Sequence, residues 1–421
     1  MPSASVMVPW LYLCVPLIAA GAAAVRARRG RTLAPLRELL VCCIGGVICG
    51  LMLISLYVYG LRGRVPPSQV AITCYWAIAV IYVLRGLNWV LTWGLARAVR
   101  SDAEGRACCP AAEVAGLIFR AVVLLLVGIP YVLAMVMIYR PHVIHPGTPI
   151  SLLGAPYQDV AFTSTDGVPL RGWWIPAVRT ARTDDVHPAV AWGQRTVIFC
   201  HGFGADKASQ LRMVRDLVPN GYNVLAIDLR AHGQSGGQLT TFGDLERRDV
   251  LGAVAWVRRN HRQECKKLFG LGESLGAAAL ISAAADPSPE GQAIDALAVF
   301  APYDSLSSLV QGLADDRFAT AAGWTVRNLA LPLAGGQLGT RVARYDPSRD
   351  VQLLWPRPIL VIASEQDRSM DISRSRALFD AALQPRYGYW LMKGGRSHML
   401  FADDKASLAV RVFFEAERSI L

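Results

Sequence analysis

The amino-acid sequence predicts a helical membrane region followed by a domain of the α/β class with a mostly parallel sheet. Of the 421 residues, 53% are hydrophobic and only 18% are charged, which is more apolar than an ordinary soluble protein. Most of the net charge of +11 falls in the first third of the chain. From about residue 157 onward, short β-branched runs alternate with amphipathic stretches, a pattern typical of a sheet covered by helices.

Residues 1–140 contain four apolar stretches of the roughly 20-residue length that crosses a bilayer core. They span residues 6–25, 39–61, 70–93 and 115–139. No basic side chain precedes the first stretch, so we expect a retained anchor and not a cleaved signal peptide. We therefore expect residues 1–140 to form about four transmembrane helices, with the lipid bilayer as their partner.

The arginines of this region flank the apolar stretches. Residues 1–140 hold 13 arginines, no lysine and four acidic residues. A nucleic-acid-binding protein would gather such charge on one folded face, so we expect no nucleic acid as partner. Eight arginines lie in the loops after the first and third stretches, and three follow the second and fourth. This bias predicts an integral protein of the cytoplasmic membrane whose C-terminal domain lies outside the cytoplasm.

Residues 141–421 form the expected α/β domain. Its predicted strands are 159–164, 170–175, 196–200, 223–227, 267–271, 296–300, 359–362 and 389–392. The amphipathic stretches between and after them are 209–218, 242–259, 275–285, 374–383 and 408–417. The alternation predicts a parallel sheet with helices on both faces. The turn Thr165-Asp166-Gly167 joins the first two strands, which we expect to form an antiparallel hairpin at the sheet edge.

The segment Gly272-Glu273-Ser274-Leu275-Gly276 matches the pattern G-x-S-x-G. An apolar strand leads into it and an alanine-rich helix leaves it, which is the strand–turn–helix context of a nucleophile elbow. The alternative is a glycine-rich connection with an incidental serine. The context favours Ser274 as a catalytic nucleophile, and such a serine needs a base and an orienting acid.

Candidates for both partners follow the serine in the chain, the order that this kind of elbow requires. Of the seven histidines, only His398 comes after the last predicted strand, in a glycine-rich loop. Asp367 follows the strand 359–362 and is the expected acid. Glu365, Asp371 and Asp304 remain as its alternatives.

An oxyanion hole needs two backbone N–H groups aimed at the developing negative charge. One is expected from Leu275, the residue after the nucleophile. The other is expected from Phe203, in the loop that follows the third strand, where Gly202 and Gly204 permit a tight approach. His201 precedes this loop and is expected to be a structural hydrogen-bonding residue and not a base.

These motifs resemble the α/β-hydrolase superfamily in their order and spacing. The segments are H-G-F-G-A-D-K, D-L-R-A-H-G-Q-S, G-E-S-L-G, S-E-Q-D and G-G-R-S-H. They look most like the branch of serine aminopeptidase-like and lysophospholipase-like enzymes, and the resemblance covers about residues 145–421. It implies an eight-stranded, mostly parallel sheet and a triad of Ser274, Asp367 and His398. It also implies that Asp228, Arg230 and His232 organise the loop after the fourth strand, where Ala231 replaces the family's usual glycine.

The resemblance leads to an expected function. A membrane-anchored serine hydrolase would cleave an acyl ester, as an esterase or a lipase-like enzyme does, through an acyl-enzyme intermediate. Its substrate would be a small-molecule or lipid acyl compound, and residues 304–346 would be a cap insertion. The alternatives are a serine peptidase or aminopeptidase-like hydrolase and a catalytically inert membrane scaffold. No cofactor is expected.

The nine cysteines carry no metal-ligand spacing, so no metal is expected. Only Cys200 and Cys265 lie in the α/β domain. In the family's sheet the third and fifth strands are parallel neighbours, which would place these two thiols at opposite edges. We therefore expect no disulfide between them.

Overall fold

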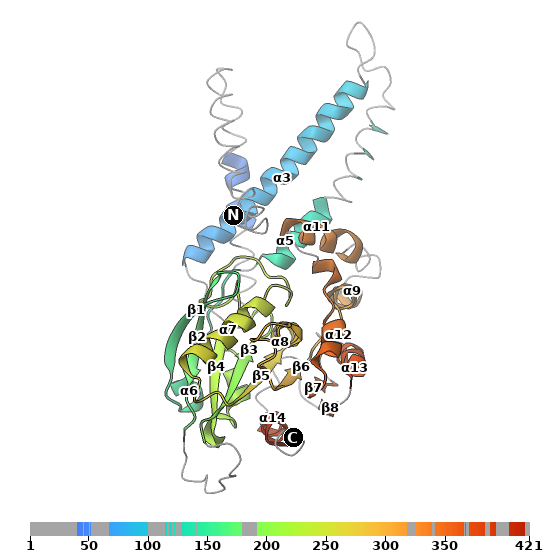
Figure 1. The fold of residues 1–421 in the computed structure, drawn as a ribbon. Helices are drawn as coiled ribbons and strands as arrows, with labels where there is room; N and C mark the ends of the chain where they lie inside the picture. The colour runs from blue at the N-terminus through green and yellow to red at the C-terminus, as the bar shows by residue number, and fades with distance from the viewer. Residues whose placement is uncertain are drawn as a thin grey trace. The chain divides into compact units, whose positions relative to one another are not determined.

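The computed structural model describes part of the chain, in two compact units (Figure 1). The described residues are 40–44, 46–49, 51, 67–99, 114–115, 118–119, 122, 128–139, 141–178, 192–317, 326–338, 342–365, 367, 370–383, 388–392 and 404–416. One unit, here the helical unit, contains α3 (Pro67–Val99), α5 (Ile129–Ile138), η4 (Val326–Ala330) and α11 (Leu331–Leu338). The other, the sheet unit, includes residues Tyr139–Gly323 and Val342–Leu421. It contains all the described strands.

The helical unit overlaps three of the four predicted membrane spans. Helix α3 covers the third span, and α5 lies in the fourth. The first span, 6–25, lies outside the described residues. Within the described part of the chain, no helix is both long and apolar enough to cross a membrane. The structure therefore gives no support to a transmembrane helix within the part of residues 1–140 that it describes.

The expected cap insertion, residues 304–346, is divided between the two units. Its first helix, α9 (Leu306–Arg317), lies in the sheet unit. The helices η4 and α11 instead pack against α5 in the helical unit. The contact is apolar, since Ala134 and Met135 of α5 and Leu331 and Ala334 of α11 are buried.

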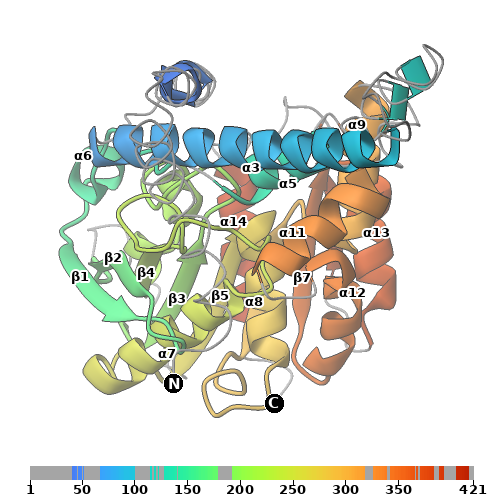
Figure 2. The same ribbon diagram turned by 90° about the horizontal axis from the view of Figure 1, so that it is seen from above.

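The sheet unit is built on one eight-stranded sheet in the order β1-β2-β4-β3-β5-β6-β7-β8 (Figure 2). The strands are β1 (Gln158–Thr163), β2 (Pro169–Ile175), β3 (Arg195–Cys200), β4 (Tyr222–Asp228), β5 (Lys267–Glu273), β6 (Ala296–Phe300), β7 (Ile359–Ser364) and β8 (Gly388–Met392). The pairs β1–β2 and β2–β4 are antiparallel, and the others are parallel. The prediction of a mostly parallel sheet that opens with an edge hairpin is confirmed.

The burial of each strand follows its place in the sheet. Every residue of β3, β4, β6 and β7 is buried, as in parallel strands that are covered on both faces. The edge strand β1 is mostly exposed. The hairpin turn holds Gly167 at a φ of 86°, where a residue without a Cβ is favoured.

Helices cover both faces of this sheet (Figures 1 and 2). The helices α7 (Arg247–Asn260) and α8 (Leu275–Ala285) pack against each other on one face. On the opposite face, α14 (Asp404–Ala416) lies beside the short 3₁₀ helix η2 (Leu211–Val214). The remaining helical segments are α6 (Pro149–Leu153), η3 (Val218–Asn220), η5 (Val342–Arg344), α12 (Pro347–Asp350), η6 (Val351–Leu354) and α13 (Ile372–Ala381).

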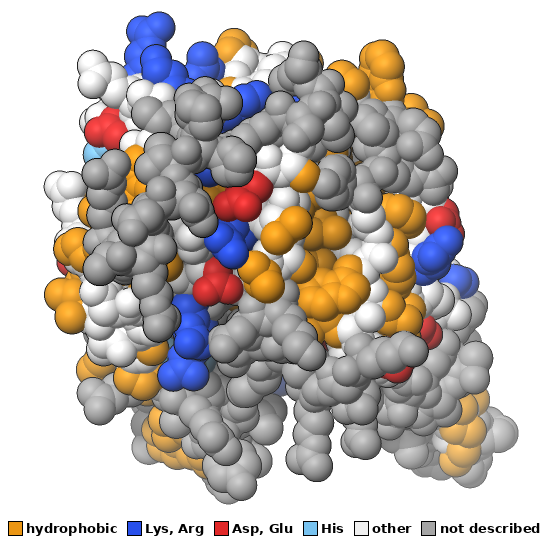
Figure 3. Space-filling model, turned by 90° about the horizontal axis from the view of Figure 1, so that it is seen from below, with side chains coloured by type: hydrophobic (Ala, Val, Ile, Leu, Met, Phe, Trp, Pro, Cys, Tyr) orange, Lys and Arg blue, Asp and Glu red, His pale blue; other side chains and the backbone are white. Residues whose placement is uncertain are grey.

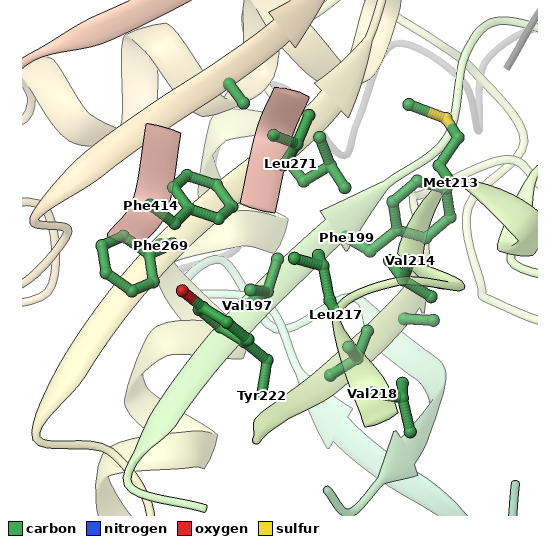
Figure 4. Packing of buried hydrophobic residues seen from close by; sticks show 14 of the residues in the cluster. Val197, Phe199, Met213, Val214, Leu217, Val218, Tyr222, Phe269, Leu271 and Phe414 are labelled. Carbon is green, nitrogen blue, oxygen red and sulfur yellow. The ribbon is translucent and has the colours of Figure 1, made fainter. Parts of the chain in front are cut away.

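Aromatic side chains fill the core between the sheet and α14 (Figure 4). The rings of Phe269 and Phe414 stack with their centroids 4.5 Å apart, and Tyr222 lies against both rings. Phe199 and Leu271, from neighbouring strands, are fully buried in the same cluster. This burial fixes the ends of β3 and β5, from which the candidate site is built.

Two predicted helices differ from the structure. Residues 209–218 form the short helix η2 and turns in place of one continuous α-helix. Residues 242–246 precede α7 as a loop. Phe242 and Gly243 have positive φ values of 58° and 116°, which are incompatible with a right-handed helix.

The surface of the described residues is mixed in character. On the face drawn in Figure 3, hydrophobic side chains gather at the centre, and basic and acidic side chains lie beside them. Ion pairs join some of the charged side chains of the sheet unit, such as Lys267 and Asp295 at 3.0 Å. The mixture agrees with the near balance of 30 basic and 28 acidic residues beyond residue 140.

Candidate active site

Ser274 stands on a sharp turn between β5 and α8. Its φ of 47° and ψ of −107° are strained for a residue with a side chain. The turn is held from both sides, since the Ser274 N–H donates to the carbonyl oxygen of Phe300 at 2.9 Å and its own carbonyl accepts from Ala278 N–H at 3.0 Å. The surrounding structure therefore maintains the strain, as expected of a nucleophile elbow.

The two glycines of the motif allow the close approach that the elbow requires. A Cβ on Gly272 would lie 2.7 Å from the backbone of Gly276. A Cβ on Gly276 would lie 2.4 Å from the carbonyl oxygen of Cys200. Because real Cβ atoms do not approach backbone atoms so closely, only glycine fits at either position without a shift of α8.

The β3 loop, residues 201–207, passes beside the start of α8. Its turn is closed by a hydrogen bond from Ala205 N–H to the carbonyl of Gly202, at 3.2 Å, and Gly204 has a φ of 79°. Phe203, between these glycines, is 38% exposed. Its ring stacks on Phe242 at 5.0 Å, so an aromatic surface adjoins the loop that is expected to supply an oxyanion donor.

His201 has the structural role that was expected. It is fully buried, its Nε2 accepts the N–H of Leu229 at 3.1 Å, and its Nδ1 donates to the carbonyl of Gly202 at 2.8 Å. An imidazole that accepts at one nitrogen and donates at the other is neutral. Burial lowers the pKa of His201, which is consistent with this neutral form.

Lys207 and Asp228 form a buried ion pair beneath the β3 loop. Lys207 Nζ lies 2.6 Å from Asp228 Oδ2 and donates to Gln234 Oε1 at 2.7 Å. The backbone N–H of Lys207 donates to the other carboxylate oxygen at 2.8 Å. Sequence reasoning gave Lys207 no role. Its place at the end of the segment H-G-F-G-A-D-K was the only available signal.

The loop after β4 is organised as the resemblance implied. Arg230 is buried between two carboxylates, with Nη2 2.6 Å from Asp249 Oδ1 and 2.7 Å from Asp166 Oδ1. Burial alone would lower the pKa of Arg230, but these charges outweigh it and raise that pKa. Burial would likewise raise the pKa of Asp166, but the hydrogen bonds and charge of Arg230 lower it to about 2.

The side chain of His232 forms a hydrogen bond within the same loop. Its Nδ1 donates to the carbonyl of Arg230 at 2.8 Å. Ala231 has a φ of 59°, which explains why glycine is usual at this position in the family that the motifs resemble. None of these contacts gives His232 a role in proton transfer.

Asp367 lies after β7, where the sequence placed it. Its Oδ1 accepts the N–H of Met370 at 3.0 Å. Two of the alternative acids have structural partners. Asp371 caps α13 by accepting the N–H of Ser373 at 2.8 Å, and Asp304 lies 3.9 Å from Arg374 Nη1. Glu365 is exposed.

His398, the expected base, lies outside the described residues, so its relation to Ser274 and Asp367 stays a prediction. Leu275 lies at the first position of α8, directly after Ser274. Among the described residues, no group of three His, Cys, Asp or Glu side chains could hold a metal ion.

Part of the chain matches a known protein family. Residues 193–354 match the family described as "Serine aminopeptidase, S33". The chain is 27% identical to the uncharacterised protein YqkD of Bacillus subtilis (strain 168) over 249 residues, which are 58% of this chain and 78% of that protein. It is 26% identical to the uncharacterised protein YfhR of Escherichia coli O157:H7 over 229 residues, which are 54% and 69% of the two chains.

A solved structure shows the same fold. The esterase Pf2001 of Pyrococcus furiosus superimposes with a TM-score of 0.50 and 22% identity, over 66% of this chain and 98% of the esterase. The strand order, the elbow at Ser274 and the match to a hydrolase family together indicate a hydrolase domain of the α/β-hydrolase fold.

Proposed function

We propose that the protein is a serine hydrolase that cleaves an acyl ester through a triad of Ser274, His398 and Asp367. The observation that carries the proposal is the conformation of Ser274. A strained, positive φ of 47° at the end of β5, kept by flanking glycines that tolerate no Cβ, supports a serine held for attack. A serine in an ordinary connection would have no need of that strain.

The proposed reaction uses two acyl-transfer steps. His398 takes the proton of Ser274 Oγ, which attacks the ester carbonyl, and the N–H groups of Phe203 and Leu275 stabilise the resulting oxyanion. The bond to the alcohol then breaks, and the alcohol leaves with the proton held by His398. Water, deprotonated by the same histidine, attacks the acyl-enzyme and releases the acid and free Ser274.

The test compares the purified wild type with Ser274→Ala on p-nitrophenyl esters of increasing chain length. We expect loss of the nucleophile to lower the rate about 10⁴-fold or more, with the fold unchanged. Ser288→Ala, in the loop after α8, is the matched control and should keep full activity. A fluorophosphonate probe should label the wild type and the control. Equal turnover by wild type and Ser274→Ala would disprove the assignment.

A peptidase is the second candidate, because the matched family is described as a serine aminopeptidase. The same triad chemistry would cleave an amide, with the amine leaving in place of the alcohol. Aminoacyl p-nitroanilides tested beside the esters separate the two activities. An inert scaffold would turn over neither substrate and would resist the probe.

We further propose that residues 1–140 tether the enzyme to the cytoplasmic membrane with the hydrolase domain outside the cytoplasm, where it would meet small-molecule or lipid acyl substrates. The apolar stretches and the eight arginines in the first and third loops support this. Alkaline phosphatase fused after Leu421 should be active, and a green fluorescent protein fusion at the same place should be dark. The opposite pair of results would place the domain inside.

A further inference from the structure

The segment that follows α5, residues 141–148, contacts both the β3 loop and the loop after β4. It begins beside Tyr139, which forms a β-bridge with Leu239. It ends at Thr148, which caps α6 with its side chain. Both ends are therefore fixed within the sheet unit. We call residues 141–148 the strap.

His142 attaches the strap to the loop after β4. The side chain is buried, with Nε2 2.8 Å from the carbonyl oxygen of Gly237 and Nδ1 3.2 Å from that of Gly233. Gly233 in turn packs on Asp228, since a Cβ there would lie 2.3 Å from the Asp228 carboxyl carbon. Asp228 is the residue that holds Lys207 at the end of the β3 loop.

His145 attaches the strap to the β3 loop directly. Its backbone N–H donates to Asp206 Oδ2 at 2.8 Å, and its Nδ1 lies 3.2 Å from Asp206 Oδ1. The same carboxylate accepts the N–H groups of Ala208 and Ser209. Asp206 is 2% exposed and stands three residues after Phe203. Burial alone would raise the pKa of Asp206, but the hydrogen bonds and charge of His145 lower it, which favours the ionised acceptor.

The turn that carries Phe203 lies between two attached parts of the β3 loop. A hydrogen bond from Ala205 N–H to the carbonyl oxygen of Gly202 closes this turn. The N–H of Gly202 donates in turn to Gln210 Oε1 at 3.1 Å. Asp206 and Lys207, which follow Ala205 directly, fix the other end of the turn through His145 and Asp228. A shift of about 1 Å at a catalytic group can cost about 100-fold in rate.

We propose that the strap positions the candidate oxyanion hole, with His145 as the positioning residue that holds Asp206 and, through it, the turn that carries Phe203. This inference rests on the proposed function, in which Phe203 N–H is an oxyanion donor. It makes the segment that leaves α5 a part of the catalytic framework of the hydrolase domain.

The test uses the full chain, purified in detergent, and three variants. His145→Ala removes the side-chain contact to Asp206. His145→Asn restores an N–H donor near the same place. His261→Ala is the matched control, because His261 stacks on Trp174 at 3.8 Å and has no contact with the β3 loop among those described. Each variant is assayed for ester kcat and KM, and for hydrogen exchange of the amides of residues 202–207.

We expect His145→Ala to lower kcat by about 10-fold to 100-fold, with KM changed less than about threefold and loop exchange faster. His145→Asn should recover much of the loss, and His261→Ala should match the wild type in kcat. Unchanged loop exchange in His145→Ala, or faster exchange with an unchanged kcat, would overturn the positioning role of the strap. Ester turnover by the wild type would still support the proposed function in that case. Equal rates for wild type and Ser274→Ala would instead overturn the proposed function, and the strap's catalytic role with it.

Discussion

Gly276 packs directly against the carbonyl oxygen of Cys200. A Cβ on Gly276 would lie 2.4 Å from that oxygen and 2.6 Å from the carbonyl oxygen of His201. The first turn of α8 therefore touches the backbone at the end of β3. This contact sets the separation between Leu275, which follows the candidate nucleophile, and the β3 loop with Phe203.

The first prediction concerns Gly276→Ala. The added methyl group must push α8 away from β3, because both contacted atoms belong to backbone. We expect the free energy of unfolding to fall by about 1–3 kcal/mol. We also expect ester turnover to fall by about 100-fold, because Leu275 N–H moves relative to Phe203 N–H. Urea unfolding and steady-state kinetics measure the two effects.

Gly336→Ala is the control for this substitution. Gly336 lies in α11, and a Cβ there would meet no atom within 4 Å. Alanine is favoured over glycine inside a helix by about 0.8–1 kcal/mol, so this variant should be slightly more stable and fully active. Wild-type turnover by Gly276→Ala would show that the contact between Gly276 and the Cys200 carbonyl does not set the geometry of the oxyanion hole.

The second prediction distinguishes Asp367 from Asp371. If Asp367 orients His398, Asp367→Asn should lower turnover by about 10⁴-fold, because the imidazole takes the wrong tautomer. Asp371 caps α13 through Ser373 N–H, so Asp371→Ala should cost about 1 kcal/mol of stability and little activity. A larger loss of turnover at Asp371, Glu365 or Asp304 would reassign the acid.

The sequence allowed the sheet to be predicted because each strand is a short apolar run. All eight predicted strands lie within two residues of the observed bounds. The elbow was also predictable, since its five residues are consecutive. The failures at 209–218 and 242–246 are local, since residues 209–218 form η2 and turns, and Phe242 and Gly243 have φ values of 58° and 116° that a right-handed helix does not allow.

Long-range polar contacts could not be predicted in the same way. His145 and Asp206 are 61 residues apart, and Lys207 and Asp228 are 21 apart. No periodicity or spacing links such pairs, because only the fold brings them together. Ala231 was predictable in part. The motif identified the departure from glycine but not the φ of 59° at this residue.

The third prediction concerns pH. Burial lowers the pKa of both His142 and His201 below the ordinary value of 6.5. Between the folded and the unfolded pKa, the unfolded chain binds more protons at these two histidines, so their contribution to the free energy of unfolding falls as pH drops below about 6.5. Each histidine contributes a slope of up to about 1.4 kcal/mol per pH unit, and neither contributes above about pH 7.5.

Urea unfolding at pH 8, 6.5 and 5.5 measures this dependence. His142→Asn should show a shallower loss of stability than the wild type between pH 6.5 and 5.5, because it lacks one of the two groups. Burial raises the pKa of Asp249 to about 6, which acts in the opposite direction in this window but equally in both proteins, and Asp166, with its pKa lowered to about 2, acts only below its unfolded value of 3.8. Identical pH dependence in the two proteins would show that His142 is not buried in its neutral form.

The fourth prediction is that Cys200 and Cys265 are not bonded to each other, even in an oxidising compartment. Both thiols are free in the structure. Cys200 pairs in register with Gly272, whereas Cys265 precedes Lys267, which pairs with Arg195 at the other end of β3. At about 3.3 Å per residue, these ends are roughly 17 Å apart, far beyond the Cα separation of about 7 Å that a disulfide allows.

Burial raises the pKa of Cys265 to about 11 and that of Cys200 well above its ordinary value, so both should react slowly with iodoacetamide in the folded protein. After denaturation without reductant, peptide mapping should find both alkylated. A linked pair of peptides that separates on reduction would show that β3 and β5 are not aligned in this way.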